Sequence, residues 1–241
     1  MAGETIKTKG IVLDIRPWSR TSHVTTWLTP DHGPVTTLVK GAVRPKSSFL
    51  GQYDLFYTCE LVYYARAKSE LHAIREAAPL DLREHLRGDF RATAFASYAA
   101  YLVKEHCPHN GEAAAWFEFL ERMLDGCRDG APPSERRLVQ LELGFLSLAG
   151  LSPDFTGADL TAETVPFSID LGHAGTGGKT VQLPSAAARL LAERVGGAET
   201  VPPEDVAAAV RFLGLFLRYH LDSPPDIRRN TRLLLAMARR K

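Results

Sequence analysis

Residues 5–41 decide the fold and read TIKTKGIVLDIRPWSRTSHVTTWLTPDHGPVTTLVKG. Three runs rich in β-branched residues follow one another in this stretch, with the turn-forming segments RPWSR and PDHG between them. Such runs are typical of β-strands, because branched side chains pack well on a pleated surface. Two further runs follow a longer loop at 41–53. The five expected strands lie at 5–15, 22–29, 34–41, 54–66 and 70–77.

Five strands in this order, with one long basic loop after the third, predict a small closed barrel of the OB-fold type. An SH3-like barrel and a simple meander remain open alternatives. Near Pro79 the apolar residues change to a spacing of 3.6, which predicts helices. Ser134 is the expected N-cap of the third helix. The expected helices lie at 81–106, 112–127, 135–150, 185–195, 203–221 and 225–241.

The order of these elements predicts an α+β fold with two domains. An N-terminal five-stranded OB-fold barrel is expected at 1–79, followed by an all-helical domain at 80–241. Pro, Gly, Thr and Asp interrupt the helical pattern at 151–183, which predicts a small irregular lobe inserted in the helical domain.

Composition and cysteine usage place the chain among ordinary soluble proteins. It has 241 residues, of which 45% are hydrophobic and 24% charged. The sequence has no apolar run near the ~20 residues that span a bilayer, and its first residues lack the apolar core of a signal peptide. Its three cysteines are scattered, which is typical of a reducing compartment. We expect a cytoplasmic protein with no membrane contact.

The segment SIDLGHAGTGGKTVQL, Ser168–Leu183, is a near match to a phosphate-binding loop. A Walker-type loop requires a glycine, four residues and then Gly-Lys-Ser/Thr. Counting back from Gly178, the position that requires a glycine holds His173, and the following KTVQLP predicts a short strand rather than a helix. A tight polar turn between two short strands fits better, so a nucleotide-dependent enzyme is the least supported class of function.

Metal and hydrolytic sites are also poorly supported. In HCPHN, residues 106–110, two histidines and a cysteine are possible zinc ligands, but no second Cys/His pair completes a four-ligand site. The sequence has no Gly-x-Ser-x-Gly elbow and no His-Glu-x-x-His helix. We expect no metal, no cofactor and no catalytic residues.

Charge is strongly segregated along the chain. Residues 1–80 carry 10 Lys and Arg against 7 Asp and Glu, residues 81–222 carry 13 against 20, and residues 223–241 carry 6 against 1. Basic ends on an acidic body indicate that particular surfaces engage a polyanion. The first 48 residues contribute seven positive charges: Lys7, Lys9, Arg16, Arg20, Lys40, Arg44 and Lys46.

Aromatic residues lie close to these charges in sequence. Charges that follow a phosphate backbone, together with aromatics on which bases stack, are how barrels bind single strands without sequence preference. Each aromatic taken alone is better explained as barrel core, and the basic loop can equally be a solvated hairpin. The aromatic residues concerned are Trp18, Trp27, Phe49 and Tyr53.

The last expected helix is basic and amphipathic. Arg228, Arg229 and Arg232 lie in its first turns, where positive charge opposes the helix dipole. A contact with nucleic acid or with a partner explains them better than helix capping does.

The chain resembles the RecO family of bacterial recombination mediators over nearly its whole length. GIVLDIRPWSRTSHVTTWLTPDHGPVTTLVKGAVRPKSSFLGQYDLF, residues 10–56, follows the family's strand, Arg-Pro turn, threonine-rich strand and Lys-Gly-Ala-x-Arg loop. PPSERRLVQLELGFLSLAGLSPDF, residues 132–155, matches the family's long helix ending in leucine, glycine and proline.

The resemblance implies a DNA repair protein without enzymatic turnover. RecO proteins bind single- and double-stranded DNA, anneal complementary strands, dock on the acidic, phenylalanine-ended tail of single-strand binding protein, and with RecR help to load RecA. A bacterial, nucleoid-associated location follows. By position, the resemblance implies phosphate contacts by Lys40, Arg44 and Lys46, and by Arg16 and Arg20. The charge pattern adds Lys7, Arg228, Arg229 and Arg232 to the expected DNA-contacting residues.

The resemblance also implies a site for the partner's tail on the third helix. Arg136 or Arg137 would meet the acidic tail, and Leu138, Leu141 and Phe145 would supply an apolar wall, although these three also suit a plain helical core. An alternative function is a protein adaptor that binds acidic peptides through the helical domain with little direct DNA contact.

One departure from the family concerns the irregular lobe. Many relatives hold it with four zinc-binding cysteines in two Cys-x-x-Cys pairs. These pairs would fall near Thr156–Asp159 and within LGHAGTGGKT, residues 171–180, and neither place has a cysteine. The chain therefore resembles the zinc-free branch, with a lobe held by turns and packing alone.

Overall fold

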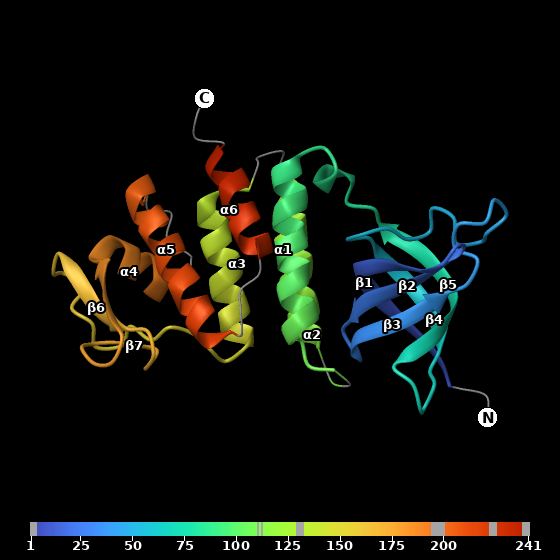
Figure 1. The fold of residues 1–241 in the computed structure, drawn as a ribbon, viewed down its shortest axis with the longest axis horizontal. Helices are drawn as coiled ribbons and strands as arrows, with labels where there is room; N and C mark the ends of the chain where they lie inside the picture. The colour runs from blue at the N-terminus through green and yellow to red at the C-terminus, as the bar shows by residue number, and fades with distance from the viewer. Residues whose placement is uncertain are drawn as a thin grey trace. The chain divides into compact units, whose positions relative to one another are not determined.

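The computed structural model describes residues 4–109, 111, 113–128, 133–193, 201–221 and 226–237. The chain divides into two compact units, Met1–Ala131 and Pro132–Lys241. The first contains a closed five-stranded barrel followed by helices, and the second contains further helices and a small sheet (Figure 1). The predicted α+β class, a barrel followed by a helical region, is confirmed. The compact units divide later than the expected boundary at 79/80, because the first two long helices belong with the barrel.

The barrel closes in the order β1-β2-β3-β5-β4. Its strands pair antiparallel except for β3 and β5, which run parallel, and pairing of β1 with β4 closes the ring. β1 continues to Ser19, through the RPWS segment that the sequence indicated as a turn, because it still pairs there with β2. The strands are β1 (Thr5–Ser19), β2 (Ser22–Thr29), β3 (Gly33–Val39), β4 (Thr58–Tyr64) and β5 (Leu71–Asp81).

The barrel core contains most of the aromatic residues that the sequence placed near the basic loop. Trp27 is fully buried, and its indole N–H donates to Thr37 Oγ1 at 2.9 Å. Tyr53 is buried with its hydroxyl 2.8 Å from His23 Nδ1, and Phe49 packs against the same cluster. Trp27 and Tyr53 are barrel core, as expected for each taken alone, and Phe49 is partly buried against that core.

A short 3-10 helix, η1 (Glu84–Leu86), separates β5 from α1 (Phe90–His106), and α2 (Ala114–Asp125) follows. The sequence predicted one helix from residue 81. The helix instead begins at Phe90 because the Asp89 carboxylate caps it, accepting a hydrogen bond from the Arg91 amide at 2.8 Å. Arg83, upstream of this cap, has a left-handed backbone with φ of 44°.

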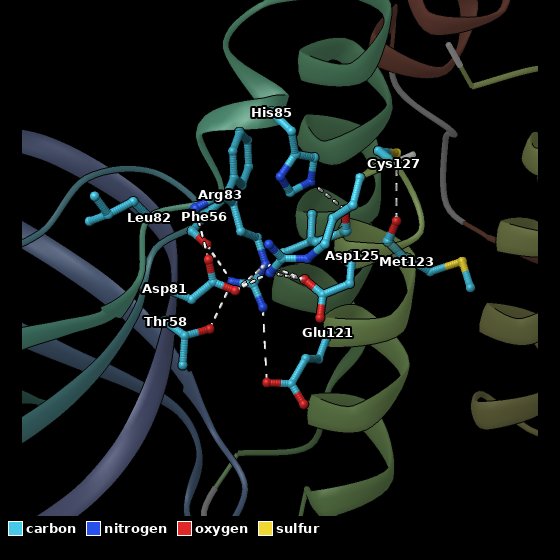
Figure 2. A network of polar contacts seen from close by, with 12 residues as sticks. Phe56, Thr58, Asp81, Leu82, Arg83, His85, Glu121, Met123, Asp125 and Cys127 are labelled. Atoms are coloured by element: carbon cyan, nitrogen blue, oxygen red, sulfur yellow. Dashed lines mark hydrogen bonds and ion pairs between the residues drawn. The ribbon is translucent and has the colours of Figure 1, made fainter. Parts of the chain in front are cut away.

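The buried Arg83 side chain joins the barrel to α2 (Figure 2). Its Nη1 donates to Phe56 O and to Thr58 Oγ1, both at 2.7 Å, and its Nε donates to Asp125 Oδ1 at 2.9 Å. Burial raises the pKa of the neighbouring Asp81 carboxyl, but a hydrogen bond from the Arg83 amide and the charge of its guanidinium help to outweigh burial and lower that pKa below its ordinary value. The contacts make the barrel and the first helices one packed unit.

The second unit combines helices with a small sheet. The sheet is antiparallel in the order β7-β6-β8 and forms most of the lobe expected at 151–183. Ser134 caps α3, as predicted, by accepting a hydrogen bond from the Arg137 amide at 3.4 Å. The elements are α3 (Glu135–Leu148), β6 (Thr164–Ser168), β7 (His173–Ala174), β8 (Thr180–Pro184), α4 (Ser185–Ala192), α5 (Pro203–His220) and α6 (Asp226–Met237).

Packing and local turns hold the lobe in place. The Phe167 ring lies 4.9 Å from the rings of both Phe155 and Phe212, which joins the lobe to α5. The Asp170 carboxylate accepts hydrogen bonds from Ser168 Oγ at 2.7 Å and from the Lys179 amide at 2.8 Å. These two bonds are the main reason that the pKa of Asp170 is lowered. The Gly-Lys-Thr segment of the near-match loop is thus a turn leading into β8.

None of the helices in the described part of the chain is long and apolar enough to cross a lipid bilayer.

Candidate nucleic-acid interface

The loop between β3 and β4 begins with three exposed basic residues, Lys40, Arg44 and Lys46. Its first turn is fixed by the Arg44 amide, which donates to Gly41 O at 3.1 Å. Two further hydrogen bonds fasten it to the β1–β2 turn: Gly41 N donates to Ser22 Oγ at 3.3 Å, and Val43 N donates to Thr21 O at 3.4 Å. The basic loop is therefore held against the end of β1.

Between the loop and the end of β1 lies a hollow of about 350 Å³, called here the Trp18 hollow. Trp18 is 62% exposed, in contrast to the fully buried Trp27. The strand pairing of β1, β2 and β3 thus brings Trp18 beside Lys40 and Arg44, which are 22 and 26 residues further along the chain. The residues that line it are Trp18, Ser19, Ser22, Leu38, Lys40, Gly41 and Arg44.

The expected DNA-contacting residues of the barrel fall into two groups. Lys40, Arg44, Lys46 and Arg20 pair with no carboxylate among the residues that the structure describes. Lys7 is 3.0 Å from Glu60 on β4, and Arg16 is 3.3 Å from Asp14 on its own strand; Lys9, also basic, is 3.8 Å from Glu121. Two of these unpaired cations, Lys40 and Arg44, line the Trp18 hollow, and the described residues that line it include no carboxylate that would repel a phosphate.

A second hollow of about 320 Å³ in the barrel is a poorer phosphate site. Its lining combines His32, His72 and His109 with the carboxylates of Asp31 and Glu70. The pKa of His72 is lowered, first by burial and then by the charges of Arg66 and His32, so its imidazole is neutral near pH 7. Two carboxylates beside a neutral imidazole disfavour a polyanion.

The HCPHN segment does not gather into a metal site among the residues that the structure describes. The Cys107 thiol is buried, which raises its pKa to about 12, whereas the His109 side chain is exposed. In the described ranges, no group of three or more His, Cys, Asp or Glu side chains is placed to hold a metal ion.

The residues expected to form the partner's tail site are not all at the surface. Arg136 and Arg137, in the first turn of α3, are partly exposed. Leu138, Leu141 and Phe145 are fully buried. The prediction that these three form an apolar wall for a peptide is therefore wrong, because they fill the core of the second unit. The alternative interpretation, that these three residues belong to an ordinary helical core, agrees with their burial.

The three arginines of α6 have different surroundings. Arg229 and Arg232 are exposed. Arg228 is buried and forms a bidentate ion pair with Glu142 of α3, at 2.7 and 2.9 Å, while also donating to Val210 O of α5 at 2.9 Å. The prediction that Arg228 contacts DNA is wrong, because its guanidinium is bound inside the helical core. Arg239 and Arg240 lie outside the described residues.

Two signals in the sequence point to the buried Arg228. Glu142 stands in the otherwise apolar run LVQLELGFL, where an isolated carboxylate needs a cationic partner. The other signal is Gly214, a glycine inside an otherwise helical apolar run, and the structure explains it, since a Cβ built there would lie 2.6 Å from Arg228 Nη1. Neither signal identifies the partner without the structure.

Comparison with known protein families agrees with this architecture. Residues 1–83 match the model described as Recombination protein O N terminal, and residues 87–229 match the model described as Recombination protein O C terminal. The chain belongs to the RecO family. It is 30% identical over 239 residues to the DNA repair protein RecO of Anaeromyxobacter dehalogenans (strain 2CP-C), covering 90% of this chain and 92% of that protein. It is 26% identical over 150 residues to the DNA repair protein RecO of Bacillus subtilis (strain 168), covering 61% and 57%.

The two RecO models meet at η1 in the first unit. The N-terminal model ends at Arg83, whose side chain extends to Asp125 on α2, inside the region matched by the C-terminal model. The RecO resemblance drawn from residues 10–56 is confirmed, and this RecO chain carries the basic loop with Lys40, Arg44 and Lys46 on its barrel.

Proposed function

We propose that this chain is a non-catalytic mediator of recombinational DNA repair. It binds single- and double-stranded DNA, anneals complementary strands and helps to load recombinase on strands coated by single-strand binding protein. The observation that carries the proposal is the basic loop of a RecO-family barrel, whose Lys40, Arg44 and Lys46 face solvent without a carboxylate partner among the described residues.

The loop suits a polyanion of any sequence. Lys and Arg side chains contact phosphates through charge and release the counterions condensed on DNA. Such contacts carry no base preference and serve single strands and duplexes alike. Neutralising phosphates on two strands also lowers their mutual repulsion, which is the physical requirement for annealing. Arg229 and Arg232 of α6 remain candidates for further phosphate contacts, because both are exposed.

The proposed partners are single-strand binding protein, through its acidic C-terminal tail, and RecR. Arg136 and Arg137 remain the residues proposed to meet the tail. The apolar end of the tail requires a surface other than Leu138, Leu141 and Phe145, since all three are buried. A nucleoid-associated location in the bacterial cytoplasm follows from DNA binding.

The proposal is tested by the salt dependence of single-strand binding, measured by fluorescence anisotropy. Each phosphate neutralised on a single strand contributes about −0.7 to the log–log slope. The triple variant Lys40→Glu, Arg44→Glu, Lys46→Glu should therefore reduce the slope by about 2. The triple variant should also anneal complementary strands more slowly than the wild type, both with and without single-strand binding protein.

A matched control separates the loop from overall charge. Arg189, Arg211 and Arg218 are exposed on α4 and α5, and reversing these three gives the same change in net charge. This control should keep the wild-type slope. A wild-type slope near zero, or an equal reduction in both triple variants, contradicts the proposed function or its location on the loop.

A further inference from the structure

We propose that the Trp18 hollow binds one unpaired base of a single strand, stacked on the Trp18 indole, with Lys40 and Arg44 on the adjoining phosphates. This inference rests on the proposed DNA binding and adds to it a residue that distinguishes single strands from duplexes. It starts from the exposure of Trp18, an indole outside the barrel core.

Trp18 is more exposed than Tyr64, the other clearly exposed aromatic residue of the barrel strands, which is 40% exposed. Trp27 is fully buried, Tyr53 is 9% exposed and Trp116 is 7% exposed, whereas Trp18 is 62% exposed. Each Å² of apolar surface left in water forgoes roughly 25 cal/mol. A planar ligand that covers the indole recovers this free energy when it binds.

The indole is held in a paired strand, at a bulge or irregularity of the β1–β2 ladder, rather than on a free loop. Trp18 lies at the end of β1, between Pro17, which pairs with His23, and Ser19, which pairs with Ser22. Pro17 also has a fixed φ, which restricts the backbone next to the indole. A stacking surface that is positioned in advance loses less conformational entropy on binding.

The walls of the Trp18 hollow suit a nucleobase. Leu38 and the indole are apolar, and Ser19 and Ser22 carry hydroxyl groups. At about 350 Å³ the hollow lies at the small end of the ~300–1,000 Å³ range of ligand clefts, which fits one ring system rather than a long ligand.

The charges beside the indole provide the second half of the argument. Lys40 and Arg44 line the same hollow, and the Arg44 side chain folds across Gly41 at its rim. An aromatic surface flanked by cations matches a nucleotide, which presents a π-face beside a phosphate. A duplex does not offer this face, because its bases are stacked and paired. The ligand is therefore a single strand.

The test compares Trp18→Ala, Trp18→Phe and the wild-type full-length chain on single-strand and duplex oligonucleotides by fluorescence anisotropy. Removing one stacked base weakens binding by roughly 5- to 150-fold. Trp18→Ala should show such a loss on single strands, with no change on duplexes and no change in salt slope, because no charge is removed. Trp18→Phe should recover most of the affinity. The matched control is Phe90→Ala, which removes an aromatic side chain that is 87% exposed on α1 and should change neither affinity.

Two further measurements test stacking directly. An abasic strand of the same length should bind the wild type as weakly as the normal strand binds Trp18→Ala, and the substitution should cause no further loss on that strand. Trp18 fluorescence should also be quenched by single strands, since the other two tryptophans are buried. Trp18→Phe should abolish that quenching.

The outcomes separate this inference from the proposed function. Unchanged single-strand affinity in Trp18→Ala, with a steep wild-type salt slope, overturns base stacking and leaves DNA binding intact. An equal loss on single strands and duplexes also overturns it, since Trp18 would then only support the loop. Absence of salt-dependent binding by the wild type contradicts the proposed function itself.

Discussion

The Glu142–Arg228 ion pair is the residue-scale feature that links α3, α5 and α6, since Arg228 of α6 donates to Glu142 of α3 and to Val210 O of α5. Glu142 is fully buried, and both of its oxygens accept hydrogen bonds from Arg228. Removing two charges from water is costly, so a complete buried pair adds little net stability compared with apolar residues. Breaking the pair is a different matter, because one charge is then buried without its counterpart.

We predict that Glu142→Gln lowers the free energy of unfolding by about 3–5 kcal/mol, measured by urea denaturation. The reason is that Arg228 keeps its charge in the core and loses its carboxylate. Arg229→Ala, at the exposed neighbouring position on α6, should stay within about 0.5 kcal/mol of the wild type. A loss below about 1 kcal/mol in Glu142→Gln would show that the pair does not organise the three helices.

A complementary double variant checks the cause. Replacing Glu142 and Arg228 together by Leu and Met removes both charges and should recover much of the stability lost in Glu142→Gln. A double variant as unstable as the single one would assign the effect to packing rather than to charge.

The contrast between Arg228 and Arg229 shows what a sequence reveals at this scale. Both are arginines in the first turns of one helix, and helical periodicity alone does not predict which of them is exposed. Their environments differ because Glu142, 86 residues upstream, accepts hydrogen bonds from Arg228, whereas Arg229 is exposed. The sequence identifies both residues as positively charged, but the contact with Glu142 determines that Arg228 is buried.

At the scale of elements, local patterns predicted the strands and helices better than their ends. Alternation and β-branching gave all five barrel strands, and Ser134 gave the start of α3. The end of β1 and the start of α1 were missed for different reasons. β1 continues through RPWS because β2 pairs with it, which is a tertiary contact, whereas α1 begins later because Asp89 caps it.

The lobe offers a prediction at the element scale, on the Gly178 turn. A Cβ at Gly178 would lie 1.9 Å from Asp170 Oδ2, so Gly178→Ala must displace the carboxylate that binds the Lys179 amide. We expect faster hydrogen exchange at the Lys179 amide and an unfolding free energy lower by about 1–3 kcal/mol. Gly172→Ala is the matched control, since it shares a positive φ, of 77°, but meets nothing within 4 Å. Equal effects in the two variants would mean that backbone strain, not the Asp170 contacts, sets the stability of the turn.

At the scale of the whole molecule, the site is assembled from segments that the sequence keeps apart. The charge pattern predicted a basic barrel, and the loop with Lys40, Arg44 and Lys46 could be selected from it. The exposure of Trp18 could not be predicted, because the sequence does not distinguish it from the three other aromatic residues near the charges. Barrel closure buries Trp27 and Tyr53, partly buries Phe49 and leaves Trp18 exposed. Barrel closure depends on pairing between β3 and β5 and between β1 and β4, which joins residues far apart in sequence.

The extent of the first folding unit is the last consequence of this arrangement. Sequence patterns set a boundary at 79/80 and the family models set one near 83–87, but the compact unit runs from Met1 to Ala131. The contacts explain the difference. Arg83 is buried against Asp125, the Ala113 amide donates to Pro30 O at 2.9 Å, and Lys104 Nζ is 3.2 Å from Asp14 on β1.

We therefore predict that a chain truncated after Arg128 unfolds cooperatively on heating, followed by near-UV circular dichroism, whereas a chain truncated after Arg83 does not. The shorter chain loses both α1 and α2, so the partners of Arg83 on α2 are absent and the barrel surface beneath the helices is exposed. Arg83→Met in the longer chain should lower its melting temperature, because Phe56 O and Asp125 lose their buried donor. Arg87→Met is the control, since its ion pair with Asp54 is exposed and should contribute little. Cooperative melting of the shorter chain at the temperature of the longer one would show that the barrel is an independent domain. Its stability would then not depend on the contacts of Arg83 with α2.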